Sequence, residues 1–233
     1  DGEVSADVVV SIGGDGTFLR AAAWVGSRET PIFGVNTGHL GYLSDVSVAD
    51  VSTFVAGLAD GNFRIERRSL LQVDTNAGVA LANRYALNEV AILKNASASM
   101  LAMDTSVDTT MLNTYLGDGL IIATPTGSTA YNLSVGGPIL HPACSSFVLS
   151  PIAAHSLTMR PLVVPDTVEI AVTTRSERSH TFRISVDGES LSLPIGSTIR
   201  LRKADLCVNV VLRAGHNFAG ALRNKLMWGA DVR

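Results

Sequence analysis

Residues 8–17 read VVVSIGGDGT, and this stretch decides the fold of the first part of the chain. Its apolar, β-branched half is typical of a strand buried on both faces of a sheet. Helix-compatible residues follow at 18–25, and a second apolar run at 31–35 (PIFGV) leads into the glycine-rich segment 36–41 (NTGHLG). Strand, glycine turn, helix and strand in this order predict a parallel α/β unit, in which ligands collect at the carboxyl ends of the strands. A helical stretch at 48–58 completes this part.

The pattern changes at about residue 64 to β-branched runs separated by turns. These runs occupy residues 70–74, 79–93, 100–107, 168–174 and 181–186. The pair Asp187-Gly188 lies between two alternating runs, which is a strong hairpin signal. Short strands without long helices between them predict an antiparallel sandwich or a related all-β domain.

A helical pattern returns after residue 217. It places Phe218, Leu222, Leu226 and Met227 on one face, and we expect this helix to return to the first domain. The predicted organisation is therefore a Rossmann-like α/β domain at residues 1–66, a β-sandwich domain at 67–216 and a C-terminal helix at 217–233. Because the chain begins at Asp1 without a methionine and soon reaches an apolar strand, we also expect the first domain to lack an upstream segment.

The composition limits the classes of protein to which the chain can belong. Of its 233 residues 46% are hydrophobic and 17% are charged, the net charge is −3 and the mean hydropathy is +0.28. A membrane-spanning helix needs roughly 20 apolar residues, whereas the longest unbroken apolar run is the five residues 21–25. The acidic balance also argues against a nucleic-acid partner. The low fraction of charged residues instead indicates that much of the surface is replaced by a large core or is covered by other subunits.

Two further observations concern the cellular compartment. Cys144 and Cys207 lack metal or redox spacing and are expected to be buried free thiols. No signal peptide is visible, which favours the cytoplasm.

The loop at 13–17 carries the first chemical signal. Glycines allow close backbone approach, and N–H groups at the start of a helix hold anions such as phosphate. A carboxylate within such a loop suggests that Asp15 contacts a metal or accepts a proton from the attacking group; the alternative is an aspartate that caps the following helix. Neither a P-loop nor a Rossmann fingerprint is present. Arg20 is the nearest fixed cation, and it contacts phosphate or lies on a solvated helix face.

Two more polar groups interrupt apolar strands. The segment 118–134 combines an acid, a strand and then a run of hydroxyl, amide and aromatic side chains, which suits an adenosine, although it also reads as a polar turn. Asn88-Glu89 lies inside the apolar run 79–93, where a carboxylate is costly to bury. Glu89 therefore faces solvent on an edge strand or points into a site that binds ribose hydroxyls or a metal.

Together, four motifs resemble those of the NAD kinase (ATP-NAD kinase) family. They are GGDGT at 13–17, NTGHLGY at 36–42, Asn88-Glu89, and the segment that runs from Asp118 to TPTGSTAY at 124–131. They occur in the family's order, and the resemblance covers nearly the whole chain. Lipid kinases and phosphofructokinases share the first motif, whereas the last is specific.

The resemblance implies transfer of the γ-phosphoryl group of ATP, or of inorganic polyphosphate in some members, to the 2′-hydroxyl of the adenosine ribose of NAD. Asp15 is then the general base, and Mg²⁺ held chiefly by ATP oxygens and water offsets the phosphate charge, with no metal ligand expected from the protein. The resemblance also implies that copies of the chain assemble into a homodimer or homotetramer through the β-rich domain. The candidate nucleotide- and NAD-binding residues are Gly13, Gly14, Asp15, Gly16, Thr17, Arg20, Asn88, Glu89, Asp118, Thr126, Thr129, Ala130, Tyr131, Asn132, Leu133, Ser134, Ala153 and Glu189, the last at a position where the family usually carries Gln.

Two rival functions stay open at this point. A diacylglycerol or sphingoid lipid kinase would show Gly-Thr-Gly-Asn-Asp after the second strand, where this chain has NTGHLG at 36–41. A non-catalytic dinucleotide-binding module would have no need of Asp15.

Overall fold

The structure, a computed structural model, describes residues 6–38, 41–95 and 100–229. Contacts divide the chain into two compact units, Asp1–Arg68 with Leu206–Arg233 and Ser69–Asp205. Two long strands, β4 (Phe63–Thr75) and β15 (Thr198–Arg213), run from one unit into the other. The domain boundaries at 66 and 216 stay predictions, beside unit boundaries at 68 and 205.

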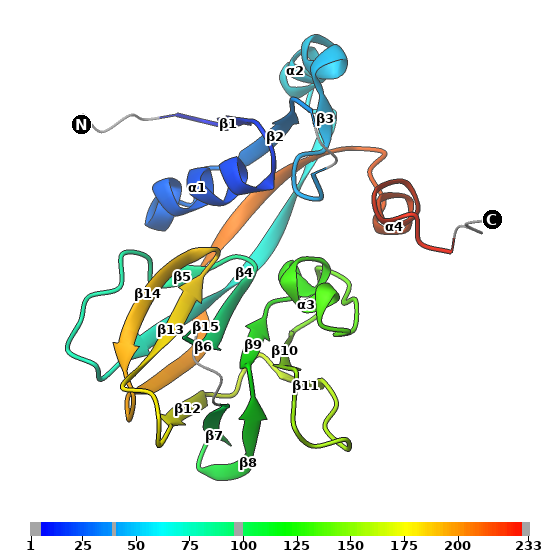
Figure 1. The fold of residues 1–233 in the computed structure, drawn as a ribbon. Coiled ribbons are helices and arrows are strands. Elements are labelled where there is room, and N and C mark those ends of the chain that lie inside the picture. Colours follow the sequence, from blue (N-terminus) through cyan, green and yellow to red (C-terminus); the bar gives the residue numbers. More distant parts are fainter. Residues whose placement is uncertain (1–5, 39–40, 96–99, 230–233) are drawn as a thin grey trace. The chain divides into compact units, whose positions relative to one another are not determined.

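The first unit contains a small parallel sheet. β1 (Val9–Ile12) pairs with β2 (Ile32–Asn36), which pairs in turn with β3 (Val46–Ser47), and the last part of β15 joins β2 at Val210. The helix α1 (Asp15–Val25) connects β1 to β2 and lies against both strands, as the blue ribbon in Figure 1 shows. The predicted α/β unit is confirmed.

The helices of this unit differ in detail from the prediction. α1 begins at Asp15 rather than at residue 18, because the N–H groups of Thr17 and Phe18 bond to the carbonyl of Gly14. The last half of the glycine motif is therefore the first turn of the helix. A short turn, η1 (Gly26–Arg28), follows it.

The predicted helix at 48–58 is present. It consists of the turn η2 (Val48–Asp50) and the helix α2 (Val51–Ala59), and the Ser47 side chain accepts from the N–H of Asp50. Phe54 of α2 packs edge-on against Phe33, with ring centroids 5.0 Å apart. This apolar contact anchors α2 on the first unit.

The C-terminal helix α4 (Phe218–Leu226) belongs to the first unit. The Asn217 side chain caps it by accepting from the N–H of Gly220 at 2.7 Å, and Ala221 and Leu222 are buried. Met227 was expected on the apolar face, but it ends the helix in a left-handed conformation and is 64% exposed.

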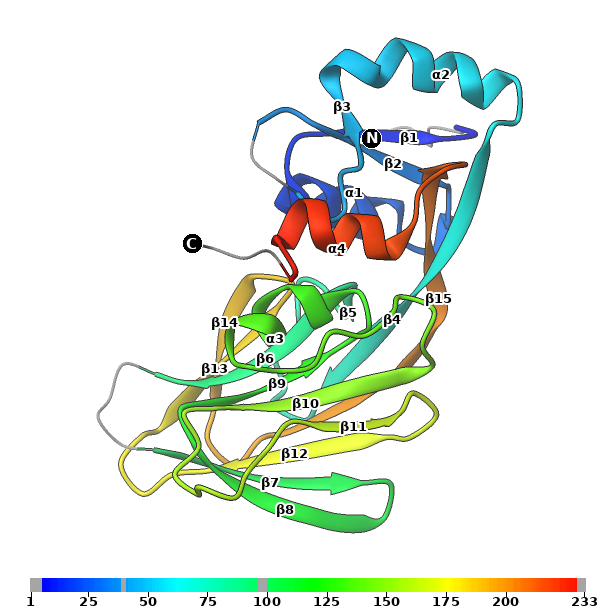
Figure 2. The same cartoon turned by 90° about the vertical axis from the view of Figure 1, so that its right-hand side faces the viewer.

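The second unit consists of two antiparallel layers. In the first, β12 (Ile170–Arg175) pairs with β15 and with β7 (Leu101–Val107), and β7 pairs with β8 (Thr110–Gly117). The second layer follows the order β11-β10-β9-β6-β13-β14 (Figure 2). Its strands are β11 (Leu162–Pro165), β10 (Ser146–Ile152), β9 (Gly119–Ala123), β6 (Glu89–Lys94), β13 (Thr181–Val186) and β14 (Glu189–Pro194). Side chains of both layers form one apolar core, so the predicted sandwich is confirmed.

The run at 79–93 is not one strand, contrary to the prediction. Strand structure occurs only in β5 (Tyr85–Ala86) and β6, because the Asn83 side chain accepts from the N–H of Tyr85 and closes a turn before β5. β6 lies between β9 and β13, so Glu89 is not on an edge strand. Among the described residues, no helix has the length and apolar character that a membrane span requires.

Candidate functional site

The glycine motif of the first unit turns the chain from β1 into α1. The N–H of Gly13 bonds to the carbonyl of Val35 at 2.9 Å, and its φ of +147° is a conformation that side chains rarely adopt. A Cβ at Gly13 would also lie 2.5 Å from the Thr17 hydroxyl. The fold therefore requires glycine at this position. At Gly14 and Gly16, by contrast, a Cβ would meet nothing within 4 Å.

Asp15 binds the loop that follows β2. Its Oδ2 accepts from the N–H of Tyr42 at 2.7 Å, and its Oδ1 accepts from the N–H groups of Leu43 at 2.9 Å and Ser44 at 3.4 Å. A Cβ at Gly41 would lie 2.6 Å from the same Oδ1. The carboxylate is thus fixed by a neighbouring loop, and the alternative in which it only caps its own helix is wrong. Residues 39 and 40 of the NTGHLGY motif lie outside the described residues.

Arg20 and Lys225 are cations that contact the glycine motif and the loop after β2 respectively, and the sequence analysis pointed only to Arg20. Arg20 is exposed, and its guanidinium donates to the Thr17 hydroxyl at 3.3 Å. Lys225 is partly buried and donates to the carbonyls of Tyr42 at 3.3 Å and Ser44 at 3.2 Å. Because a lysine in the last turn of a helix reads as a solvated residue, no sequence pattern indicated this role.

In the second unit the Asn88-Glu89 motif meets two other segments. The Asp187 carboxylate accepts from the N–H groups of Leu87 at 2.7 Å, Asn88 at 2.8 Å and Glu89 at 3.1 Å. The N–H of Thr124 bonds to the carbonyl of Asn88 at 2.9 Å, and the Thr124 hydroxyl donates to the carbonyl of Leu87. The structure thus brings together three sequence motifs that lie far apart in the chain.

The hairpin pair Asp187-Gly188 does more than turn the chain. Both residues have positive φ, 48° and 90°, as a tight two-residue hairpin requires. Residues Val186 and Glu189 pair across the turn, so the predicted hairpin is confirmed. No sequence pattern indicated that the Asp187 side chain would also cap the 87–89 segment.

Glu89 and Asp187 form a partly buried acidic pair. Burial and the charge of Asp187 raise the pKa of Glu89 from 4.5 to about 7, while a hydrogen bond from the Tyr131 backbone acts in the opposite direction. Burial also raises the pKa of Asp187 to about 6, against the effect of its three backbone donors. The Oε2 of Glu89 is buried without a hydrogen-bond partner among the described residues. A donor such as a ribose hydroxyl would satisfy it.

This pair makes the stability of the protein pH-dependent. Between about pH 4.5 and 7 the folded protein holds a proton on Glu89 that the unfolded chain releases, so stability is lost as the pH rises through this window. Glutamine is neutral throughout this range. We therefore expect the free energy of unfolding of Glu89→Gln to fall between pH 5 and pH 8 by less than that of the unaltered protein, with a difference on the order of 1–3 kcal/mol. Urea unfolding of both proteins at the two pH values measures the difference, and equal losses would contradict the raised pKa of Glu89.

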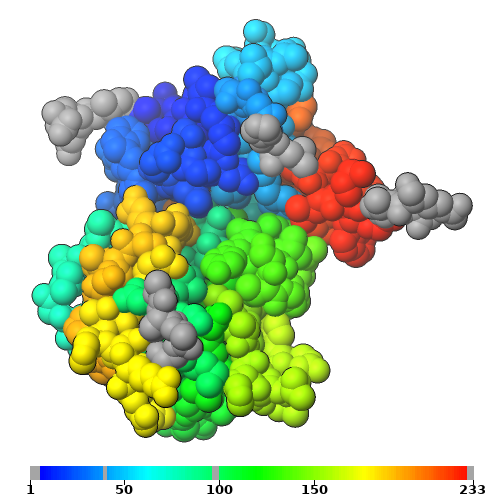
Figure 3. Space-filling model, viewed as in Figure 1, coloured from blue at the N-terminus to red at the C-terminus, as the bar shows by residue number. Residues whose placement is uncertain are grey.

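The segment after β9 is buried at residues 124–128 and reaches the surface of the second unit further along, green in Figure 3. It forms the turn η3 (Gly127–Thr129) and the short helix α3 (Tyr131–Ser134). Thr126 is buried and its carbonyl accepts from the Thr129 hydroxyl at 3.2 Å, while Tyr131 is 40% exposed. Ala130 and Leu133 are partly buried and Ser134 is exposed.

Asn132 is fully buried, and its side chain holds the turn together. Its amide donates to the carbonyls of Ser128 at 2.9 Å and Pro138 at 3.0 Å, and its carbonyl accepts from the Ser150 hydroxyl at 2.6 Å. A contact between Asn132 and a nucleotide therefore stays a prediction, beside this structural role.

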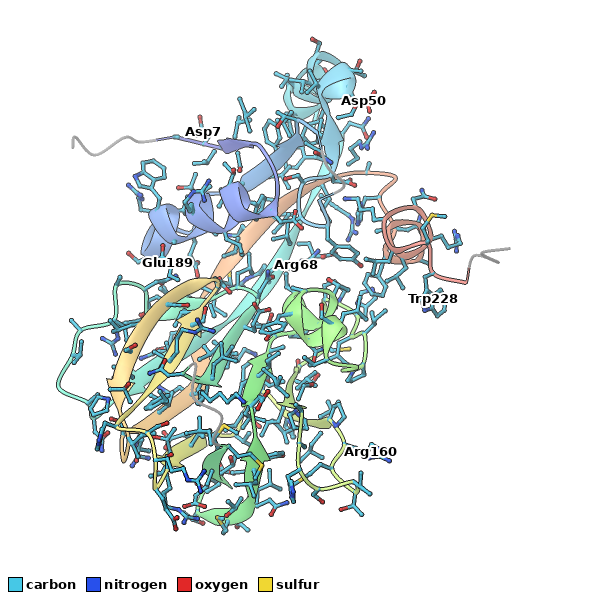
Figure 4. The ribbon with its side chains drawn as sticks, in the orientation of Figure 1. Asp7, Asp50, Arg68, Arg160, Glu189 and Trp228 are labelled. Atoms are coloured by element: carbon cyan, nitrogen blue, oxygen red, sulfur yellow. The ribbon has the colours of Figure 1, made fainter. Side chains whose placement is uncertain are left out.

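The three remaining candidates lie at strand ends. Asp118 pairs with Lys94 at 2.6 Å. Ala153 follows β10 with a φ of +45°, which is unusual for a residue other than glycine. Glu189 begins β14 beside the hairpin turn and is labelled in Figure 4. Its charge raises the pKa of Asp187.

Comparison with known proteins covers almost the whole chain. The family model of the ATP-NAD kinase N-terminal domain matches residues 2–63, and that of the ATP-NAD kinase C-terminal domain matches residues 87–212. An NAD kinase of Bacteroides fragilis is 47% identical over 228 residues, which make up 98% of this chain and 78% of that protein. An NAD kinase of Porphyromonas gingivalis is 48% identical over 227 residues, 97% of this chain and 78% of that protein.

Two solved structures are similar in fold. Yeast NADH kinase complexed with NADH gives a TM-score of 0.90 at 25% identity, covering 98% of this chain and 68% of that chain. An NAD kinase from Archaeoglobus fulgidus in complex with ATP gives a TM-score of 0.79 at 30% identity, covering 93% of this chain and 83% of that chain.

Proposed function

Since the chain belongs to the ATP-NAD kinase family, we propose that it transfers the γ-phosphoryl group of ATP to the 2′-hydroxyl of the adenosine ribose of NAD, giving NADP. The matches confirm the family predicted from the four sequence motifs. They do not favour a lipid kinase.

The open space around Asp15 is the observation that carries this proposal. Gly14 and Gly16 flank the carboxylate, and the protein itself leaves room for a Cβ at both positions. Folding therefore does not explain two of the three glycines, whereas close approach of a phosphate chain does. The start of α1 lies at the same point and supplies N–H donors for an anion.

Asp15 keeps one unoccupied lone pair, which a general base needs to accept a proton. A carboxylate offers about four lone pairs, and three backbone N–H groups occupy two sites on Oδ1 and one on Oδ2. One lone pair of Oδ2 is left to accept the proton of the 2′-hydroxyl as its oxygen attacks the γ-phosphorus and ADP leaves. The loop from Tyr42 to Ser44 would hold the carboxylate during this step.

Mg²⁺ enters this proposal as part of the substrate MgATP. Among the described residues no group of three or more His, Cys, Asp or Glu side chains is placed to hold a metal ion. Asp15 is already bound to three N–H groups. An ion bound mainly by phosphate oxygens and water fits these residues, and it would offset the charge of the triphosphate.

The second unit supplies the proposed dinucleotide contacts. Asn88 and Glu89 are held rigidly by Asp187, and the exposed ring of Tyr131 is free to stack on a base. Glu189 and the candidates within 124–134 would line the same part of this unit. Asp118 and Ala153 lie at the other end of β9 and β10, beside the Leu93–Gly119 pair, and their contacts with the dinucleotide stay predictions.

Self-association and a cytoplasmic setting complete the proposal. Apolar side chains on the outer strands β8 and β11 are exposed, Met111 at 55% and Val163 at 44%, which supports a homodimer or homotetramer.

The cysteines bear on the proposed cytoplasmic setting. Cys144 and Cys207 are free thiols, as expected in a reducing compartment, although Cys144 is exposed rather than buried as predicted.

The direct test of the function is an assay for NADP. The protein is incubated with NAD, ATP and Mg²⁺, with parallel mixtures in which polyphosphate replaces ATP or diacylglycerol replaces NAD, and with a control that lacks Mg²⁺. We expect NADP from NAD and ATP. Absence of NADP with both donors, or phosphorylation of the lipid, would overturn the proposal.

Gly16→Ala separates folding from phosphate binding. Gly16 is the second residue of α1, where alanine should stabilise the protein by about 0.5–1 kcal/mol. The added methyl would occupy the space proposed for the phosphates, so we expect the KM for ATP to rise by about tenfold or more while the melting temperature does not fall. An unchanged KM for ATP would place the phosphates elsewhere.

A further inference from the structure

The loop of residues 42–45 is bound through both its N–H groups and its carbonyls. Its N–H groups at Tyr42, Leu43 and Ser44 donate to the Asp15 carboxylate. Its carbonyls at Tyr42 and Ser44 accept from the Lys225 ammonium at 3.3 Å and 3.2 Å. The backbone of the loop thus connects Lys225 to Asp15 through polarised peptide groups.

A third contact fixes the ammonium on this loop. Lys225 lies 3.5 Å from Oδ1 of Asp45, whose Oδ2 contacts Nδ1 of His216 at 2.9 Å. The pKa of Asp45 is lowered, with burial opposed by the hydrogen bond and charge of His216 and by the charges of Lys225 and Arg213. Since the three N–H donors of Lys225 face Tyr42, Ser44 and Asp45, none is left for a ligand.

The charges of Lys225 and Asp15 also interact. Burial lowers the pKa of Lys225, whereas the carboxylates of Asp45 and Asp15 raise it. The lysine is therefore a partly buried cation that interacts with two carboxylates, that of Asp45 in the loop and that of the candidate base Asp15. Its burial distinguishes it from the surface lysines whose charges contribute little.

The spacing of residues in α4 places the Lys225 side chain on the face of the helix that packs against the first unit. Lys225 follows Ala221 by four positions and Leu222 by three, so it lies on the buried face of the helix. Arg223 and Asn224 fall on the exposed face. The Asn217 cap and the buried pair Ala221 and Leu222 set the position of the helix within the first unit.

We propose that Lys225 is a positioning residue for phosphoryl transfer, which holds the loop of residues 42–45 so that its N–H groups keep the Asp15 carboxylate in place. It touches neither substrate. This inference rests on the proposed function, and it gives the C-terminal helix a part in the reaction. Removal of the ammonium would free the carbonyls of Tyr42 and Ser44 and loosen the three bonds to Asp15.

The test is Lys225→Met in the intact chain. We expect kcat for NADP formation to fall by about 10- to 100-fold, because a small displacement of a catalytic group has effects of this size, while the KM values for NAD and ATP change little. Amide hydrogen exchange of Tyr42, Leu43 and Ser44 should become faster. Arg223→Met is the matched control, because it removes a cation from the exposed face of the same helix.

Several outcomes would overturn the inference. These are an unchanged kcat in Lys225→Met, an equal loss in Arg223→Met, or unchanged amide exchange in the loop. If the Met variant does not fold, Lys225→Gln, which keeps two donors without the charge, carries the same readouts. The exchange experiment needs no turnover, so it distinguishes failure of this inference from failure of the proposed function, in which the unaltered protein makes no NADP.

Discussion

Asp15→Asn is expected to lower kcat for NADP formation by roughly 10²- to 10⁴-fold while NAD binding is retained. The amide keeps the shape of the side chain but cannot accept the proton of the 2′-hydroxyl. Its carbonyl can still accept from the N–H groups of Leu43 and Ser44, which share Oδ1 in the native carboxylate. Steady-state kinetics measure kcat, and titration calorimetry with NAD measures binding.

The structure predicts a second, smaller effect of this substitution. The new NH₂ group would face the N–H of Tyr42, which donates to Oδ2 in the native protein. One unsatisfied donor costs about 1–3 kcal/mol, so the free energy of unfolding should fall by an amount of this order. Asp60→Asn, at an exposed carboxylate of the same unit, is the control. Near-normal kcat would remove Asp15 from the role of base, and parallel loss of kcat and NAD binding would indicate an anchoring role only.

Much of the fold could be predicted because its signals are local. The apolar run that forms β1, the glycines after it and the hairpin at Asp187-Gly188 each act through neighbouring residues, so a short window of sequence contains the cause. The run at 79–93 misled the prediction for the same reason. Its apolar residues look continuous, whereas the turn at Asn83 and the cap from Asp187 divide it.

The candidate site was predictable only in part, because its supporting contacts are long-range. Lys225 and Tyr42 are 183 positions apart, and Asp187 and Leu87 are 100 positions apart. No composition or spacing signals such a pair without a structure. Asn132 shows the converse, since its polar side chain suggested a ligand contact and is found fully buried, with its amide bonded within its own unit.

Gly127→Ala is expected to have the largest effect on stability. A Cβ at this position would overlap the carbonyl oxygen, carbonyl carbon and Cα of Asn88, all of them backbone atoms that cannot rotate away. The N–H of Gly127 also bonds to the Thr124 hydroxyl at 3.1 Å, which in turn donates to the carbonyl of Leu87. Overpacking of this kind costs typically 1–3 kcal/mol and occasionally more, and we expect about 3 kcal/mol or more because two segments must separate.

Urea unfolding and amide exchange together test this expectation. The amide of Thr124, which bonds to the carbonyl of Asn88, should lose protection in Gly127→Ala, because the added methyl pushes the two segments apart. Gly215→Ala is the matched control, since a Cβ there would meet nothing within 4 Å and the backbone is not in the left-handed region. Full stability of Gly127→Ala with normal protection at Thr124 would contradict the close packing of these segments. Loss of protection together with weaker NAD binding would support the proposal that Asn88 and Glu89 bind the dinucleotide only while the 124–127 turn holds them.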